Sequence, residues 1–151
     1  MRLSTFLAIY KAGRKRFENL QISHLQLPKE PFPNLYIKHS VLEQFEAEQS
    51  ILDYFTIVCS TVTRSSFYQT HFGASIFKEC QLTQVDFQAA SMQDVYFTDC
   101  ELNQVDLSST NLERASIYHS KLRQVSLVNA KLDNLHFQWT ELQELYLSSP
   151  T

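Results

Sequence analysis

A large apolar side chain returns at every fifth position through most of this chain. The register is clearest in the series Phe77, Leu82, Phe87, Met92, Phe97, Leu102, Leu107, Leu112, Ile117, Leu122, Leu127, Leu132, Phe137, Leu142 and Leu147. Helices gather apolar residues with a period of about 3.6 and strands with a period of about 2, so a period of five would scatter them around either element. The chain must therefore turn about every five residues and wind into a coil that stacks on itself.

Four such units make a coil of twenty residues, in which every twentieth residue stacks on the one before it. The resulting columns are uniform in character. One large apolar column runs Phe17, Ile37, Ile57, Phe77, Phe97, Ile117 and Phe137. Two residues before each apolar centre, small and bulky columns alternate, and one small column contains Ser40, Ser60, Cys80, Cys100, Ser120 and Thr140. A close-packed core requires such an exchange of volume.

Individual units also approach a known consensus of a small residue, an Asp or Asn, and a Leu or Phe. The nearest matches are Val85-Asp86-Phe87, Val105-Asp106-Leu107 and Thr110-Asn111-Leu112. From residue 17 to residue 147 the chain resembles the pentapeptide repeat family, although valine often stands at the small position. The resemblance implies an all-β fold, a right-handed quadrilateral β-helix with about 20 residues per coil. It implies no single function, because the family spans many unrelated roles.

The two ends differ. Apolar residues at helical spacing predict a short helix from Ser4 to about Lys11, so we expect residues 1–13 to cap the rod and residues 14–151 to form the β-helix. No second cap is predicted after Leu147, where the sequence continues as Ser148-Ser149-Pro150-Thr151. We therefore expect two chains to stack through their C-terminal coils as a homodimer.

Residues 28–56 follow the pattern least well. Three prolines, at positions 28, 31 and 33, favour a bulge or loop, and Ser40-Val41-Leu42-Glu43 fits a helix capping box. Leu42 and Phe45 nevertheless keep both the register and the alternation of size, which a helix would not require. We favour a continued coil over a loop or a helix.

Composition limits the function. A chain of 151 residues that is 44% hydrophobic is expected to form one domain, and only two glycines leave no glycine-rich loop for phosphates. No apolar run is long enough to span a membrane, and no export signal precedes the helix, so we expect a cytoplasmic protein without membrane contact. Among the three cysteines, Cys80 and Cys100 are predicted to be small buried side chains, with a disulfide as the alternative.

Exposed aromatic residues gather on one predicted side of the coil. The candidate partner-binding residues are Tyr96, Tyr118, His119, His136 and Trp139, with Ile76 beside them. Such residues are enriched where proteins meet, whereas the alternative is that they only stiffen a flat β surface. The first functional hypothesis is a scaffold without catalytic activity that binds another protein.

Charge is distributed unevenly along the chain. Residues 1–38 hold seven basic and two acidic residues, a net charge of +5, and residues 39–113 hold two basic and eleven acidic residues, a net charge of −9. Some relatives that confer quinolone resistance resemble a DNA rod and occupy the DNA-binding groove of a type II topoisomerase. The second hypothesis, implied by that resemblance, is a DNA-mimicking inhibitor of DNA gyrase. Its candidate residues are Glu79, Asp86, Asp99, Glu101 and Asp106.

A third hypothesis is metal binding by the outward column that contains Glu79, Asp99 and His119, although ligands that all point one way do not converge on an ion. No cofactor is predicted. We expect no direct contact with nucleic acid, because the basic run Arg14-Lys15-Arg16 is short. We also expect no enzymatic activity, since the sequence shows no catalytic triad and a filled coil leaves no substrate cleft.

Overall fold

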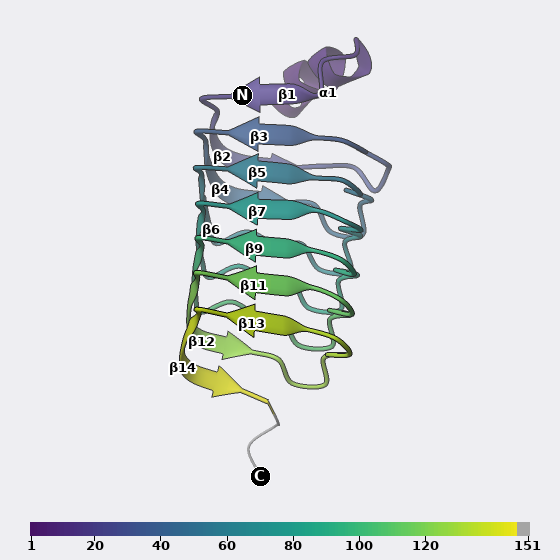
Figure 1. The fold of residues 1–151 in the computed structure, drawn as a ribbon. Coiled ribbons are helices and arrows are strands. Elements are labelled where there is room, and N and C mark those ends of the chain that lie inside the picture. The colour runs from purple at the N-terminus through teal and green to yellow at the C-terminus, as the bar shows by residue number, and fades with distance from the viewer. Residues whose placement is uncertain (148–151) are drawn as a thin grey trace.

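The computed structural model describes residues 1–147 as one helix followed by a four-sided rod of stacked coils (Figure 1). The helix α1 spans Leu3–Lys11 and lies at the N-terminal end of the rod. It begins one residue before the predicted start at Ser4. Residues 148–151, which include the last residues of the predicted β-helix, lie outside the described part. No helix among residues 1–147 has the length and apolar character that crossing a membrane would take.

Two sides of the rod are parallel sheets of seven strands each. The first side consists of β1 (Arg16–Glu18), β3 (Tyr36–Lys38), β5 (Thr56–Val58), β7 (Ile76–Lys78), β9 (Tyr96–Thr98), β11 (Ser116–Tyr118) and β13 (His136–Gln138). The second side consists of β2 (Gln21–Gln26), β4 (Val41–Glu46), β6 (Thr61–Thr63), β8 (Gln81–Thr83), β10 (Glu101–Asn103), β12 (Lys121–Ser126) and β14 (Glu141–Tyr146).

The other two sides are held by isolated parallel bridges. A third side contains the series Glu46, Ser66, Asp86, Asp106 and Ser126, and a fourth side contains Pro31, Ile51, His71, Ser91, Asn111 and Lys131. On every side the paired residues lie twenty positions apart, as in Phe17 with Ile37 and Leu102 with Leu122. Residues 28–56 keep this offset and contain β3 and β4, so neither a helix nor an inserted loop forms there.

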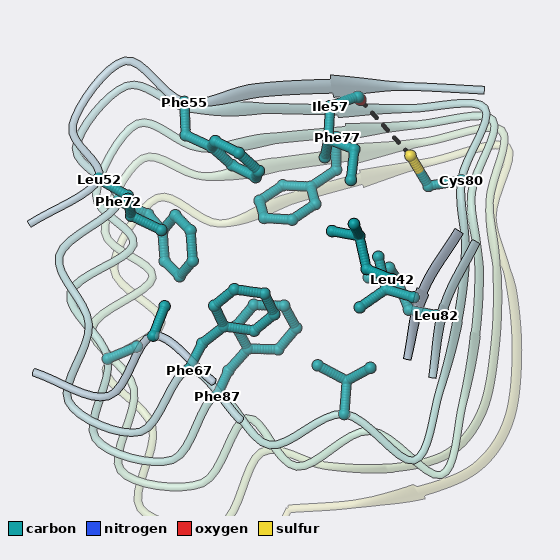
Figure 2. Close-up of a cluster of buried hydrophobic side chains, with 14 of the residues drawn as sticks. Leu42, Leu52, Phe55, Ile57, Phe67, Phe72, Phe77, Cys80, Leu82 and Phe87 are labelled. Carbon is teal, nitrogen blue, oxygen red and sulfur yellow. Dashed lines mark hydrogen bonds between the residues drawn. The ribbon is translucent and has the colours of Figure 1, made fainter. Parts of the chain in front are cut away.

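Phenylalanine side chains fill the middle of the rod (Figure 2). Phe77 stacks on Phe97 with ring centroids 4.8 Å apart, and Phe67 stacks on Phe87 at 5.2 Å. Rings from different sides meet edge to face, as Phe72 does with Phe77 at 5.6 Å. Both geometries are favourable for aromatic pairs, and they allow one continuous core to run along the axis.

The inward hydroxyl groups explain why small polar residues recur beside the apolar centres. The backbone N–H of Leu20 donates to Oγ of Ser40 at 3.0 Å, and the N–H of Ser40 donates to Oγ of Ser60 at 3.0 Å. Each hydroxyl also donates to a carbonyl, as Ser40 Oγ does to Lys38 O at 2.8 Å. A serine on the next coil therefore satisfies a buried amide that the backbone ladder leaves without a carbonyl partner.

The thiols of Cys80 and Cys100 occupy this same column. Both are free and buried, and they donate to Ile57 O at 3.4 Å and to Phe77 O at 3.2 Å. The disulfide alternative is absent from the structure, and the small-residue interpretation fits these contacts. The pKa of the Cys100 thiol is raised, chiefly by its hydrogen bond with Cys80 and then by burial.

Replacing Cys80 with serine should therefore leave the fold intact. We expect Cys80→Ser to change the free energy of unfolding by less than about 1 kcal/mol, because the hydroxyl can donate to the same carbonyl. In contrast, Cys80→Leu should destabilise by about 1–3 kcal/mol, because the column has no room for the added carbons. Urea unfolding measures both changes; equal stability of the two variants would contradict the packing described here.

The corners of the coil share one backbone conformation. From Asn19 to Glu144, every fifth residue among those described has a positive φ, apart from position 29, and the chain uses glycine at none of these corners. Side chains as different as Ala74, Arg114 and Trp139 occupy them. A corner residue can therefore be exchanged for another residue that is not β-branched without a new backbone demand.

The N-terminal helix closes the first coil. Phe6 is fully buried and stacks on Phe17 with centroids 4.7 Å apart, and Tyr10 donates its hydroxyl to Pro33 O at 2.8 Å. The ammonium group of Lys15 lies 3.7 Å from the centroid of the Tyr10 ring. The capping helix expected from the sequence is confirmed.

Candidate protein-interaction surface

The five aromatic and histidine residues predicted from the sequence lie over three consecutive coils of the first side. We call them the aromatic face: Tyr96, Tyr118, His119, His136 and Trp139. Tyr96 begins β9 and His136 begins β13, and both pair with Ser116 of β11. Tyr118 ends β11, and His119 and Trp139 occupy the following corner. The β-helix therefore brings together residues that are up to 43 positions apart.

Trp139 is the most prominent member of the aromatic face. It is 70% exposed, and its ring stacks on that of His119 with centroids 4.8 Å apart and planes inclined by 26°. Tyr96 is 46% exposed. Stacking holds the indole in one orientation before any partner arrives, and a fixed aromatic ring loses little conformational entropy on binding.

The acidic residues predicted to mimic DNA divide into two groups. Glu79 and Asp99 occupy the corner between the first and second sides, and Glu101 begins β10. Asp86 and Asp106 pair with each other on the third side. The first group thus lies at one corner and on the adjoining end of the second side, and the second group lies on the third side, so they do not form one acidic surface.

Asp86 and Asp106 also have a structural role that the sequence prediction did not include. Oδ1 of Asp86 accepts the backbone N–H of Gln88 at 2.7 Å, and Oδ1 of Asp106 accepts the N–H of Ser108 at 2.8 Å. Asn111 makes the equivalent bond to the N–H of Glu113 at 3.0 Å. These side chains close turns, which is a common reason for Asp or Asn in this position.

Folding disfavours the charged form of the Asp86 carboxyl group relative to its neutral form. Burial is the largest cause of its raised pKa, and the negative charges of Asp106 and Glu48 act in the same direction. Because the pKa is higher in the folded state, the charged group lowers stability at neutral pH. This penalty disappears as the pH falls from the folded pKa to below the unfolded value of about 3.9.

Asp86→Asn should therefore stabilise the protein at pH 7. The amide oxygen can still accept the N–H of Gln88, as Asn111 does for Glu113. We expect a higher free energy of unfolding at pH 7 and a shrinking difference from the unmodified chain as the pH falls to about 3.5. Denaturant unfolding at both pH values measures this, with Asp133→Asn on the fourth side as a control. A destabilised variant at pH 7 would contradict the prediction.

The metal hypothesis finds no support among the described residues. Glu79, Asp99 and His119 lie on successive coils of one column, and no group of three His, Cys, Asp or Glu in residues 1–147 is placed to hold an ion. Oε2 of Glu79 instead accepts from the Cys59 thiol at 3.0 Å, and the His119 ring faces Trp139.

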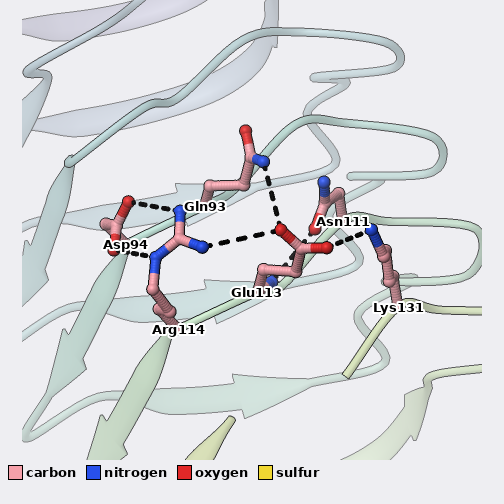
Figure 3. A network of polar contacts seen from close by, with 6 residues as sticks. All are labelled: Gln93, Asp94, Asn111, Glu113, Arg114 and Lys131. Carbon is pink, nitrogen blue, oxygen red and sulfur yellow. Dashed lines mark hydrogen bonds and ion pairs between the residues drawn. The ribbon is translucent and has the colours of Figure 1, made fainter. Parts of the chain in front are cut away.

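A charged network on the fourth side was not predicted from the sequence (Figure 3). Asp94 accepts two hydrogen bonds from Arg114, at 2.9 and 3.1 Å, and this contact holds the pKa of Asp94 below its usual range. Glu113 contacts Lys131, Gln93 and Arg114, and the hydrogen bond from Lys131 is the main cause of its lowered pKa. Asp94 and Arg114 are twenty residues apart, so the repeat alone predicts that they lie on adjacent coils and can form an ion pair.

Next to this network, the fourth side contains an open hollow of about 350 Å³. Gly73 and Ala74 line it on one coil, with Tyr54 on the coil before and Asp94 on the coil after. The remaining lining residues are Asp53, His71, Ser91, Gln93 and Arg114. The hollow exists because two consecutive outward positions carry almost no side chain.

Two family models match the repeated part of the chain. A model described as "Pentapeptide repeat region" matches residues 59–126, and one described as "Pentapeptide repeats (8 copies)" matches residues 110–144. The two matches together cover more than half of the chain. The chain belongs to the pentapeptide repeat family. Comparison with curated protein sequences gave no match.

Solved structures of the family show the same fold. The chain is similar to a trypsin-treated variant of QnrB1, a plasmid-mediated fluoroquinolone resistance protein, with 16% identity and a TM-score of 0.59 over 86% of this chain and 74% of that one. Full-length QnrB1 gives 13% identity and a TM-score of 0.54 over 89% and 87%. The expected right-handed, four-sided β-helix is confirmed by this likeness. At these identities the likeness concerns the fold alone.

Proposed function

We propose that this pentapeptide repeat protein is a scaffold without catalytic activity that binds another protein through the aromatic face. The exposed Trp139, held by its stack on His119, carries the proposal. Interface centres are enriched in Trp and Tyr because these side chains bury a large area with few rotatable bonds. The rigid sheet beneath them fixes the spacing of the rings from coil to coil.

Affinity capture from extract of the native cell tests this proposal. The bait is the unmodified chain or the variant Tyr118→Ala/Trp139→Ala, and the matched control is Tyr68→Ala/Gln88→Ala on the third side. A partner that the control retains and the aromatic variant loses supports the proposal. A partner that all three baits capture equally would exclude the aromatic face as its site.

The second candidate is a DNA-mimicking inhibitor of DNA gyrase. Two observations favour it: the net charge of −9 over residues 39–113 and the fold likeness to QnrB1. A supercoiling assay with purified gyrase tests it, using Glu79→Gln/Asp99→Asn/Glu101→Gln as the variant that lacks the corner charges. Inhibition by the unmodified chain that DNA competes away and that the variant loses would favour this candidate. Absence of inhibition would reject it.

We also propose that the C-terminal coil mediates self-association. Apolar core positions of this coil are exposed, with Leu142 at 48% and Leu147 at 60%. β13 and β14 are the terminal strands of their sheets, so their outer backbone groups have no strand partner among the described residues. A second copy would cover both features by an isologous contact. Light scattering at high concentration should give a dimer mass that Leu142→Glu lowers, and a monomer would reject the proposal.

A further inference from the structure

The shape of the hollow on the fourth side follows from one column of corner residues. Tyr54, Ala74, Asp94 and Arg114 follow one another at twenty-residue intervals. Between Tyr54 and Asp94 the column contributes only the methyl group of Ala74, so the opening spans two coil spacings, about 10 Å. That width is enough for a flat group to enter beneath the Tyr54 ring.

Gly73 lies against Asp53, whose carboxylate occupies the space that a side chain at position 73 would need. The N–H of Gly73 donates to Oδ1 of Asp53 at 2.8 Å, and a Cβ on Gly73 would lie 2.9 Å from that same oxygen. This contact fixes the Asp53 carboxylate at the edge of the hollow. Its other oxygen makes no hydrogen bond within residues 1–147 and can accept one from an incoming group.

The charges around the hollow favour a positive group. The lining contains the carboxylates of Asp53 and Asp94 and the guanidinium of Arg114. Asp94 already binds Arg114 in a two-point contact, which leaves the charge of Asp53 uncompensated. Lys131, on the next coil, is engaged by Glu113. An anion in the hollow would be repelled by the Asp53 carboxylate. A cation would be attracted by it and would face no positive group that lacks an acidic partner.

Tyr54 supplies the second element of recognition. Tyr54 is 61% exposed and lines the hollow, so a ligand can stack on the face of its ring. The same chain already shows cations resting on tyrosine rings: the guanidinium of Arg16 lies 4.0 Å from the Tyr36 centroid, and the ammonium of Lys15 lies 3.7 Å from that of Tyr10. Arginine suits such a place best, because its plane stacks on the ring while its edge donates to a carboxylate.

We infer that this hollow is a docking site for an arginine side chain of a partner protein, stacked on Tyr54 and paired with Asp53. The site lies on a different side of the rod from the aromatic face, so it goes beyond the proposed function. Ala74 is two residues before Ile76, which begins β7 on the first side. A protein that covers the corner could therefore use both surfaces, but the arginine site does not depend on this.

A titration with defined peptides tests the site without the native partner. The probe is an uncharged-ended Gly-Arg-Gly-Arg-Gly peptide, and its control is the same peptide with citrulline, which keeps the shape of arginine and removes the charge. Backbone amide shifts of isotope-labelled protein report the location and the affinity. We expect the largest shifts at Tyr54, Gly73 and Ala74, and at least about tenfold weaker binding of the citrulline peptide.

Two pairs of variants distinguish the hollow from general attraction to an acidic rod. Ala74→Gln fills the hollow. Ala89→Gln adds the same side chain at the corner between the third and fourth sides, with nearly the same φ, 58° against 54°. Asp53→Asn keeps an acceptor for the N–H of Gly73 and removes the charge, with Asp133→Asn as its control. Ala74→Gln and Asp53→Asn should each weaken binding about tenfold, and the controls should not.

The inference fails if the shifts spread evenly over Glu79, Asp99 and the other acidic residues, or if Ala74→Gln binds as well as Ala89→Gln. It also fails if the citrulline peptide binds equally well. Circular dichroism and thermal melting of each variant establish that the fold is retained before binding is compared. Because only peptides are used, failure here leaves the capture experiment on the aromatic face unaffected.

Discussion

Leu102→Lys should abolish cooperative folding of the chain. Leu102 lies at the centre of β10, is 1% exposed, and pairs with Leu82 and Leu122 on the neighbouring coils. The substitution forfeits about 1.5–3 kcal/mol of apolar burial and forces an ammonium group into a core that offers it no partner. We expect the free energy of unfolding to fall by more than about 4 kcal/mol, measured by urea unfolding or by loss of the thermal transition.

The matched control is Gln104→Lys. Gln104 lies two residues after Leu102, at an exposed corner with φ of 56°. Arg64 occupies the same column two coils earlier, with φ of 48°. A long cation is therefore already accommodated in that column. The control should unfold within about 0.5 kcal/mol of the unmodified chain. Normal melting of Leu102→Lys would refute the assignment of this position to the core.

The second large effect is expected at the cap. Phe6→Ala should lower the free energy of unfolding by about 3–5 kcal/mol, because Phe6 is fully buried against Phe17 and lies 6.3 Å from the Phe32 ring. Loss of this side chain detaches α1 from the first coil and exposes the apolar end of the rod. Thermal unfolding gives the size of the loss, and amide exchange in β1 shows where it acts.

Thr5→Ala is the control for the cap, because Thr5 is exposed on the same helix and alanine favours helix formation. It should leave the unfolding transition unchanged or slightly raised. If Phe6→Ala were equally harmless, α1 would have no capping role. Faster amide exchange confined to the first coils would instead show that the helix protects the end of the rod.

The fold could be predicted because the same information is repeated in each coil. The columns through Phe17 and Ile22 restate one register seven times, so a weak unit such as the one around Pro28 could not override its neighbours. For the same reason, a short local motif that favours a helix does not override the repeat. The capping box at Ser40 forms no helix, because Leu42 and Phe45 are fixed in the core of β4 by the coils on either side.

The site was predictable only in part. The positions of the aromatic face follow from the period, but the stack of His119 on Trp139 depends on side-chain rotamers at a corner, which no periodicity encodes. The hollow depends on two adjacent small residues, Gly73 and Ala74, whose effect appears only when Tyr54 and Asp94 are placed twenty residues on either side. The turn bond of Asp86 depends on its position in the backbone, which the distribution of charge along the sequence does not encode.

The most direct test of the proposed interaction surface is hydroxyl-radical footprinting of the chain with its captured partner. Oxidation of Trp139, Tyr96 and Tyr118 should fall when the partner binds, while oxidation of Tyr68 on the third side should stay the same. Protection of Tyr68 with unchanged oxidation of Trp139 would contradict the account and move the interface to another side of the rod.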